Sequence, residues 1–254
     1  MAKMFAATRD ANYRRSFDRG LAYVLAAQYP NGGWPQFFPL RTGYHDRITF
    51  NDNAMVRVLE FVRDASRDET YAFLDAATRE SCRGAFDRGV ACVLKCQIVV
   101  DGEPTVWCAQ HDEHTFAPAK ARAYEPPSFS GQESVGIVRL LMSLERPSPE
   151  VRSAIEGAVA WLEAHTITGQ RLVRTKGEGG KTDLQMVPDP GAPALWARFY
   201  DLASGRPFVC DRDGVPRPHL ADLSDERRNG YSWYGEYARD LLAHEYPRWR
   251  EAHR

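Results

Sequence analysis

The chain has 254 residues, and the 43% of them that are hydrophobic suffice for one large domain with a substantial core. A formal net charge of −1 argues against binding to nucleic acid or a membrane surface through an overall electrostatic field. No apolar run is long enough for a membrane-spanning helix, and the first ten residues lack the apolar stretch of a signal peptide. We therefore predict one soluble domain over residues 1–254 that binds charged ligands through local charges.

One helical pattern occurs three times at a constant spacing, with apolar residues at three- and four-residue steps. Its copies are FDRGLAYVL (17–25), FDRGVACVL (86–94) and IEGAVAWL (155–162). A second helix is expected within each repeat, over residues 53–62, 133–144 and 234–244. Two helices and a long loop per repeat indicate an array of α-hairpins.

Three long segments rich in Gly, Pro and aromatic residues separate these helices. They cover residues 29–50, 99–129 and 169–193. Loops of this length in a compact domain usually carry function, so the chemistry is expected there.

The first loop contains NGGWPQFFP (31–39), in which glycines permit unusual backbone angles and aromatic rings offer flat surfaces. Trp34 either plugs the end of a helical barrel or stacks on a sugar ring. Farther on, Asp52 precedes the helix expected over 53–62, where a carboxylate can serve simply as a cap. Together with Asn53 and nearby Asp46, it would instead offer the oxygen ligands that Ca²⁺ prefers.

The densest polar segment begins at WCAQHDEH (107–114). A zinc site on His111 and His114 is disfavoured, because the segment has no HExxH helix and no third ligand at a diagnostic spacing. Lys120 and Arg122 follow among aromatic residues and prolines. They are either solvent-facing charges or ligands of a carboxylate, which a fixed guanidinium binds in bidentate geometry.

Two more candidate arginines lie in the last third of the chain. Arg198 is embedded in the apolar run WARFY, and Arg212 lies in the turn CDRDG. Structural ion pairs, such as Arg198 with Asp201 or Glu133, are one interpretation. The other is that cationic residues in separate loops, without an overall basic charge, bind a polyanionic sugar.

Five cysteines are present, without the CxxC spacing of a metal site. Cys92 and Cys96 stand one helical turn apart. We predict buried free thiols, with a disulfide between two of the cysteines as the alternative.

Taken in order, the segments NGGWPQFFP, ITFNDNAM, WCAQHDEHTFAPAKARAYEPPS, SGQESVGIVRLLMSLE, APALWARFY and NGYSWYG resemble polysaccharide lyase family ten, the pectate lyases. The resemblance extends roughly over residues 28–235. It implies an all-α fold, an α/α toroid or incomplete barrel of about three helix pairs with long loops and minor β structure. It also implies cleavage of polygalacturonate by anti-β-elimination and dependence on Ca²⁺.

Residue by residue, the resemblance makes Asp52 the calcium ligand and Arg122 the catalytic base. The residues expected to bind substrate are Arg198, Arg212, Lys120, Trp34 and Tyr231. The resemblance further implies a monomeric enzyme, located outside the cell or in the periplasm, that acts on polygalacturonate or oligogalacturonides. The family carries an additional N-terminal stretch with another active-site acid, whereas only about thirty residues precede NGGWP here, so we expect a catalytic domain lacking that segment.

Proton removal from C5 requires a base that is unprotonated at the working pH. Removing the C5 proton beside a uronate carboxylate is slow unless cations neutralise that carboxylate and stabilise the enolate-like intermediate. Arginine is normally protonated, so Arg122 can act as the base only if Ca²⁺ and Lys120 disfavour its charged form and the pH is high. An alkaline optimum is expected.

Other functions compete with this interpretation. An α/α-toroid glycoside hydrolase would use two carboxylates, such as Asp52 and Asp112, on neutral sugars. A non-catalytic pectin-binding protein would bind oligogalacturonate without forming unsaturated ends. A helical scaffold for protein partners is the weakest alternative, because the aromatic residues and arginines concentrate in loops.

Overall fold

The computed structural model describes residues 1–176, 180 and 182–253. The chain divides into two compact units, of which the first comprises Met1–Lys95 and Asp112–Phe116 and the second comprises Cys96–His111 and Ala117–Arg254. None of the helices in the described residues is both long and apolar enough to cross a membrane.

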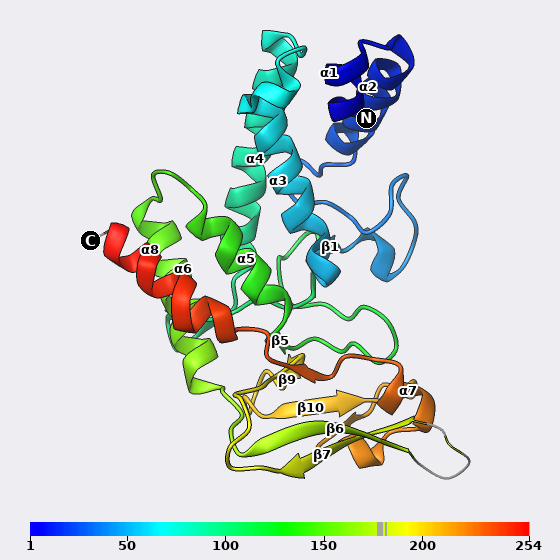
Figure 1. Cartoon of the computed structure of the whole chain (residues 1–254), viewed down its shortest axis with the longest axis vertical. Helices are drawn as coiled ribbons and strands as arrows, with labels where there is room; N and C mark the ends of the chain where they lie inside the picture. Colours follow the sequence, from blue (N-terminus) through cyan, green and yellow to red (C-terminus); the bar gives the residue numbers. More distant parts are fainter. Residues whose placement is uncertain (177–179, 181, 254) are drawn as a thin grey trace. The chain divides into compact units, whose positions relative to one another are not determined.

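The first unit is helical. Its helices are α1 (Ala2–Thr8), α2 (Ala11–Ala26), α3 (Ala54–Arg67) and α4 (Ala76–Cys96), the last of which ends one residue beyond the unit (Figure 1). The Asp10 side chain caps α2 by accepting a hydrogen bond from the Asn12 backbone N–H at 2.8 Å. One face of α3, including Leu59 and Val62, is buried, so amphipathic periodicity determines its packing.

The short elements of the first unit lie mainly between α2 and α3. They are the 3₁₀ turns η1 (Tyr44–Asp46) and η2 (Asn51–Asn53), the strand β1 (Ile48–Thr49) and, after α3, η3 (Glu69–Tyr71). This succession of short elements leads the chain from the NGGWPQFFP loop into α3.

The second unit contains both helices and sheets. Its helices are α5 (Glu133–Met142), α6 (Pro149–Ala164), α7 (Asp225–Asn229) and α8 (Tyr246–Ala252), with a 3₁₀ turn η5 (Leu220–Asp222) and a π-helical turn η6 (Leu241–Glu245). Ser148 caps α6, and Pro149 occupies its first turn, where a missing N–H costs nothing. Arg139 of α5 pairs with Glu245 of η6 at 2.7 Å.

Small antiparallel sheets fill the rest of this unit. The strands β5 (Phe129–Ser130), β9 (Phe199–Tyr200), β10 (Pro207–Cys210) and β11 (Pro216–Arg217) form one sheet in the order β11-β10-β9-β5. A hairpin joins β6 (Gln170–Lys176) to β7 (Thr182–Pro188), with Val173 opposite Gln185. The remaining pairs are β8 (Trp196–Ala197) with β12 (Tyr234–Gly235), and β2 (Val99–Val100) with β3 (Glu103–Pro104); β4 spans Gln110–His111.

A core of aromatic and aliphatic side chains joins the hairpin to the four-stranded sheet. Leu184 of β7, Phe199 of β9 and Phe208 of β10 belong to it, as do Tyr124 and Trp233 from segments around the sheet. Burial of this apolar surface stabilises the loops that carry the arginines discussed below.

The predicted helices are confirmed where the repeats place them. The three copies of the pattern lie in α2, α4 and α6, and the helices expected over 53–62 and 133–144 are α3 and α5. The helix expected over 234–244 is wrong at its start, because Tyr234–Gly235 is strand β12 and pairs with β8. All five cysteines are buried free thiols, as expected.

The all-α fold class is wrong. The protein is 47% helical, with 16% of residues in strands that form several small sheets. The largest error is the loop expected over 169–193, most of which is the β6–β7 hairpin. Leu172, Leu184 and Met186 pack on the core, although the glycines and prolines of this segment suggest a loop. Residues 177–179 and 181 of that segment lie outside the described residues. A single catalytic domain over the whole chain stays a prediction.

Candidate active site

The second unit brings three of the predicted arginines together. Arg122 lies between β4 and β5, Arg198 lies between β8 and β9, and Arg212 lies in the turn that follows β10. Two tyrosine rings, Tyr124 and Tyr231, pack edge to face between them with centroids 5.3 Å apart. We refer to these five residues as the arginine–tyrosine cluster.

Each guanidinium of the cluster lies over one of these rings. The Cζ atom of Arg122 is 5.1 Å from the Tyr124 centroid and 5.7 Å from that of Tyr231. Arg198 Cζ is 4.7 Å from the Tyr231 ring, and Arg212 Cζ is 6.0 Å from the Tyr124 ring. These cation–π contacts hold the planar cations in fixed orientations.

Arg122 forms a bidentate ion pair with Glu125. Its Nε and Nη2 donate to the two carboxylate oxygens at 2.8 and 2.5 Å, and the Tyr231 hydroxyl donates to Glu125 Oε1 at 2.6 Å. The Glu125 side chain is 1% exposed, whereas that of Arg122 is 36% exposed. Arg122 is therefore the accessible member of the pair.

The electrostatics of this pair favour charge on both partners. The hydrogen bond to Glu125 raises the pKa of Arg122 above its usual range. Burial would raise the pKa of Glu125, but the hydrogen bonds from Arg122 and Tyr231 outweigh burial and lower it. Burial raises the pKa of Tyr231, so this hydroxyl stays protonated. The partner nearest to Arg122 thus opposes the neutral form that a base requires.

Arg198 is a buried member of the cluster. Its Nη2 lies 2.6 Å from Glu133 Oε1, and the two side chains are 5% and 0% exposed. Ser130 Oγ donates a hydrogen bond to the other Glu133 oxygen. The structural ion pair with Glu133, one of the interpretations drawn from the sequence, is what the structure contains. Its effect is to fix the guanidinium beneath the ring of Tyr231.

Arg212 is the most exposed arginine of the cluster, at 60%, and it shares Glu226 with Arg227. Arg212 donates to both Glu226 oxygens at 2.9 and 2.5 Å, and Arg227 Nη2 donates to one of them at 2.9 Å. The hydrogen bond from Arg212 is the main reason that the pKa of Glu226 falls to about 2. The buried Arg227 lies with its Cζ 4.5 Å from the Tyr124 centroid.

Sequence reasoning missed Arg227, Glu125 and Tyr124. Their positions in the sequence were the available signal, since Arg227 lies two residues before the NGYSWYG segment and the other two follow Arg122 in the motif AKARAYEPPS. Four arginines lie beside three glutamates in this region, and Asp211 next to Arg212 adds a further carboxylate. Lys120 lies near the β10–β11 turn: its side chain is exposed, and a Cβ built on Gly214 (φ +76°) would lie 3.8 Å from its Nζ. The β10–β11 turn therefore approaches the Lys120 segment closely.

Asp52 lies in the first unit, within the 3₁₀ turn that leads into α3. Asp52 and Asn53 both adopt left-handed backbone angles, with φ of 53° and 60°. The side-chain oxygens Oδ1 of Asn53 and Oδ1 of Asp46 are buried and make no hydrogen bond within the described residues. Such oxygens suit Ca²⁺, although the described residues contain no group of three or more His, Cys, Asp or Glu side chains that could hold a metal. Asp52 and Asn53 offer oxygen ligands of the kind that Ca²⁺ takes, and calcium binding here stays a prediction.

Trp34 is a core residue of the first unit. It is 4% exposed, and its indole N–H donates to the Val24 carbonyl at 2.8 Å. A Cβ built on Gly89 would meet Trp34 at 3.0 Å and Leu59 at 2.3 Å, so α4 needs a glycine where it passes the indole. This position favours the interpretation that Trp34 plugs the unit. Its contact with substrate stays a prediction.

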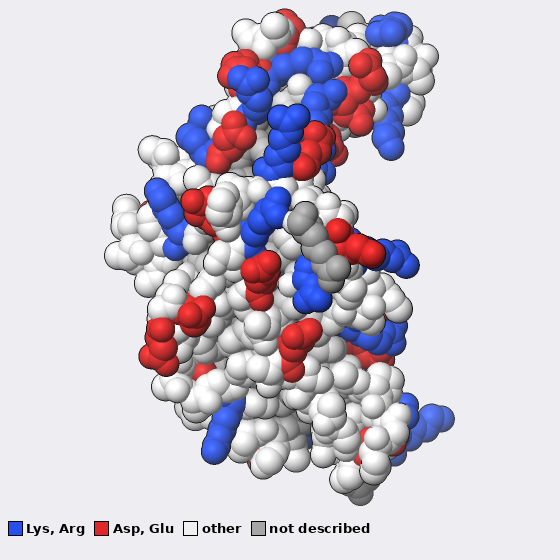
Figure 2. All heavy atoms as spheres, turned by 90° about the vertical axis from the view of Figure 1, so that its left-hand side faces the viewer, with Lys and Arg blue, Asp and Glu red and all other residues white. Residues whose placement is uncertain are grey.

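Asp112, one of the two carboxylates that the glycoside hydrolase interpretation would use, is poorly suited to the role of general acid. Asp112 pairs with Arg47, and the backbone hydrogen bond from Thr115 is the main cause that lowers the pKa of Asp112. A general acid of a glycosidase requires a raised pKa. The face seen in Figure 2 carries Lys and Arg side chains interspersed with Asp and Glu.

The comparisons with known proteins define the class. The chain is 34% identical to a family 10 polysaccharide lyase from Cellvibrio cellulosa, with a TM-score of 0.86 over 95% of this chain and 74% of that chain. A mutant of family 10 polysaccharide lyase from the same organism, in complex with trigalacturonic acid, matches with the same identity and TM-score over 95% and 75%. The fold is thus that of a polysaccharide lyase, and no curated protein matches.

A family model described as pectic acid lyase matches residues 1–242. The chain belongs to the pectic acid lyase family, which confirms the resemblance found in the sequence. It is a pectate lyase, an enzyme of polysaccharide degradation.

Proposed function

We propose that the protein cleaves polygalacturonate and oligogalacturonides by anti-β-elimination, with the arginine–tyrosine cluster as the part of the site that receives the uronate. The observation that carries this proposal is the clustering of Arg122, Arg198 and Arg212 on the rings of Tyr124 and Tyr231. The complex of the Cellvibrio mutant with trigalacturonic acid supports the choice of substrate.

The cationic side chains differ in solvent exposure, and this difference indicates different roles. Arg212 and Arg122 have accessible guanidinium groups, and Lys120 is exposed beside the β10–β11 turn. Of these groups, Arg212 and Lys120 bind uronate carboxylates and stabilise the negative charge that develops when the C5 proton leaves. The buried Arg198 acts as a positioning residue, because its pair with Glu133 fixes the guanidinium against Tyr231.

Arg122 is the proposed base, and its ion pair with Glu125 determines the pH range in which the neutral guanidine is available. Because the pair with Glu125 keeps Arg122 protonated, only a small fraction of neutral guanidine exists near neutral pH. This fraction rises about tenfold for each pH unit below the pKa. The neutral guanidine accepts the C5 proton, and the C5 electron pair forms the C4–C5 double bond. The bond from C4 to the glycosidic oxygen breaks with its electron pair on that oxygen, which takes a proton from solvent to become a hydroxyl. The rate is therefore expected to rise steeply with pH.

Calcium is the proposed cofactor. Asp52, with the Asn53 side-chain oxygen, would hold the ion in the first unit. Ca²⁺ bound there would supply positive charge of the kind that polarises a carboxylate. We further propose that the enzyme acts outside the cell or in the periplasm, because its polymeric substrate is too large to enter the cytoplasm. We also propose that it is a monomer.

A comparison of conservative variants tests the role of the cluster. Arg122→Lys is expected to lose most of kcat while oligogalacturonate affinity changes little, because lysine keeps the charge but loses the planar fork. Arg212→Lys is expected mainly to raise Kd. Arg139→Lys, which alters an ion pair between α5 and η6, serves as the matched control and should resemble the parent chain. Full turnover in Arg122→Lys would remove it from the base position.

A further inference from the structure

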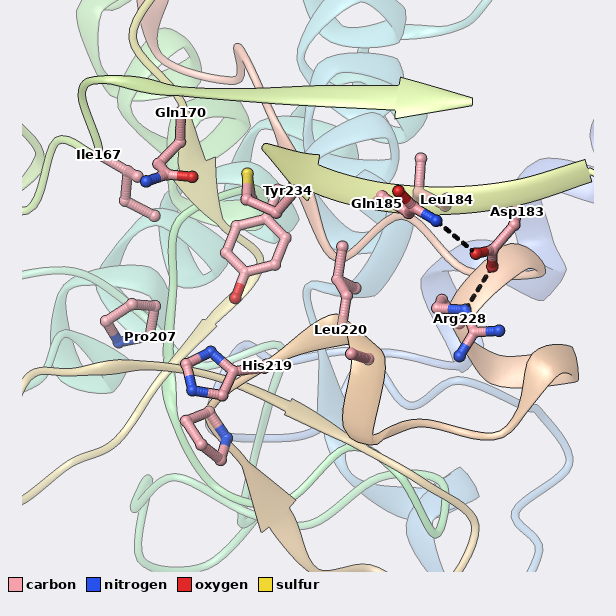
Figure 3. Close-up of a pocket in the computed structure, with 13 residues that line it drawn as sticks. Ile167, Gln170, Asp183, Leu184, Gln185, Pro207, His219, Leu220, Arg228 and Tyr234 are labelled. Carbon is pink, nitrogen blue, oxygen red and sulfur yellow. Dashed lines mark hydrogen bonds and ion pairs between the residues drawn. The ribbon is translucent and has the colours of Figure 1, made fainter. Parts of the chain in front are cut away.

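A second site lies against the β6–β7 hairpin of the second unit. A cavity of ≈ 580 Å³ opens there between the hairpin, the segment that includes His219 and Leu220, and β12 (Figure 3). Its volume falls within the range typical of small-molecule sites. Its lining shares no residue with the arginine–tyrosine cluster. The elimination chemistry does not use this cavity.

The acidic residue of this cavity pairs with its basic residue. Asp183 and Arg228 both line the cavity and form an ion pair at 2.6 Å. The Gln185 side-chain amide also donates to Asp183, at 3.0 Å. A uronate carboxylate would have to break this pair and leave Asp183 without its cation, which is costly in a partly buried site. The cavity therefore disfavours the acidic substrate of the lyase.

The other end of the cavity offers polar groups to a ligand. Figure 3 shows the side chains of Gln170, Tyr234 and His219 around the same space. Within the residues that the structure describes, no hydrogen bond engages the Gln170 amide or the Tyr234 hydroxyl in another side chain or backbone group. Burial raises the pKa of Tyr234 to about 12, so its hydroxyl remains a donor. An entirely apolar ligand would desolvate these groups without replacing their hydrogen bonds.

Apolar surface completes the lining. Ile167, Pro207 and Leu220 line the cavity, and the ring of Tyr234 offers an aromatic face. Such a combination suits a ligand with C–H faces and hydroxyl groups but no net charge. We propose that this cavity binds an uncharged pyranose of a saccharide, at a site separate from the one that performs elimination. Two sources share that chemistry, a neutral sugar residue and a methyl-esterified galacturonate.

Matched ligands distinguish these sources. Tetragalacturonide is prepared in three forms, with its carboxylates free, methyl-esterified, or reduced to primary alcohols. Binding of the two uncharged forms is measured by titration calorimetry on the Arg122→Lys variant of the full chain, first alone and then with saturating free-acid tetramer. We expect at least one uncharged tetramer to bind, with an unchanged Kd when the acidic tetramer is present. Binding of the ester alone identifies esterified pectin as the source, and binding of the reduced form identifies a neutral sugar.

Substitutions then assign the binding to the cavity. Added to that background, Gln170→Ala and Tyr234→Phe each remove one hydrogen-bonding group, and each is expected to weaken binding about tenfold. Gln170→Ala in the otherwise unaltered enzyme should leave the initial rate on polygalacturonate unchanged, which also reports correct folding. The proposal is overturned if neither uncharged tetramer binds, if the acidic tetramer displaces them, or if both substitutions leave their Kd unaltered. None of these outcomes depends on whether the chain performs elimination.

Discussion

Replacing Glu125 by glutamine probes the proposed base most sharply. The Glu125 carboxylate accepts two hydrogen bonds from Arg122, at 2.8 and 2.5 Å, and one from Tyr231, at 2.6 Å. Glutamine has nearly the same shape and keeps an oxygen for Tyr231, but it removes the negative charge that raises the pKa of Arg122. If Arg122 is the base, its neutral form becomes more abundant at every pH.

The size of the effect follows from the geometry. A hydrogen bond to a charged group contributes about 1.5–3 kcal/mol, and one pKa unit corresponds to about 1.4 kcal/mol. Because more than a third of the Arg122 side chain is exposed, solvent screening reduces the contribution, and about one pKa unit remains. The rising limb of kcat against pH should therefore move about one unit toward lower pH, which is about a tenfold gain in rate at a fixed pH on that limb.

The assay is the initial rate of unsaturated product formation from polygalacturonate, measured from neutral to strongly alkaline pH with saturating calcium. Glu226→Gln is the matched control, since it alters an equivalent bidentate pair with Arg212. That variant should change KM without moving the limb. An unmoved limb in Glu125→Gln, accompanied only by a lower rate, would refute the reasoning and assign Arg122 to substrate binding.

The structure also predicts the effects of two further substitutions and of acid. Arg198→Met should lower the free energy of unfolding by about 3 kcal/mol, read from denaturant melts, because it leaves Glu133 buried without its cation; an unchanged midpoint would contradict the buried pair. Asp52→Asn should raise the calcium concentration for half-maximal rate at least tenfold with little change in the thermal midpoint, and an unaltered calcium curve would remove Asp52 from the site. Acidification should reduce the free energy of unfolding as the pH falls from about 4.5 toward 2. In this window Glu226 takes up a proton in the unfolded chain but stays ionised in the folded protein, where its pKa is about 2. Calorimetric melting temperatures that stay constant over the window would oppose this assignment.

The helices could be predicted because their signal is local. Leu59 and Val62 of α3, like Phe17 and Leu21 of α2, recur at helical spacing and are buried in the structure. The small sheets could not be predicted, because most of their strands are only two residues long and form only by pairing with distant segments. Phe199, for example, pairs with both Phe208 and Ser130, a non-local constraint that no short sequence window contains.

The candidate site likewise has features that could be predicted from the sequence and features that could not. Sequence motifs identified Arg122 and Arg212, whose surroundings are rich in turn-forming residues, but spacing alone did not reveal which carboxylates they pair with. Glu125 lies three residues from Arg122, whereas Glu226 lies in α7, well separated in sequence from Arg212. The buried position of Trp34 likewise depends on α2 and α4, whose packing the loop sequence does not specify.

The most direct test of the central claim is the ultraviolet absorbance of unsaturated ends released from polygalacturonate by the unaltered chain, with calcium present and after its removal by a chelator. We expect product to form at alkaline pH with calcium, to stop on chelation, and to resume when calcium is restored. Binding of oligogalacturonate with no unsaturated product under any of these conditions would contradict the account and identify the chain as a pectin-binding protein.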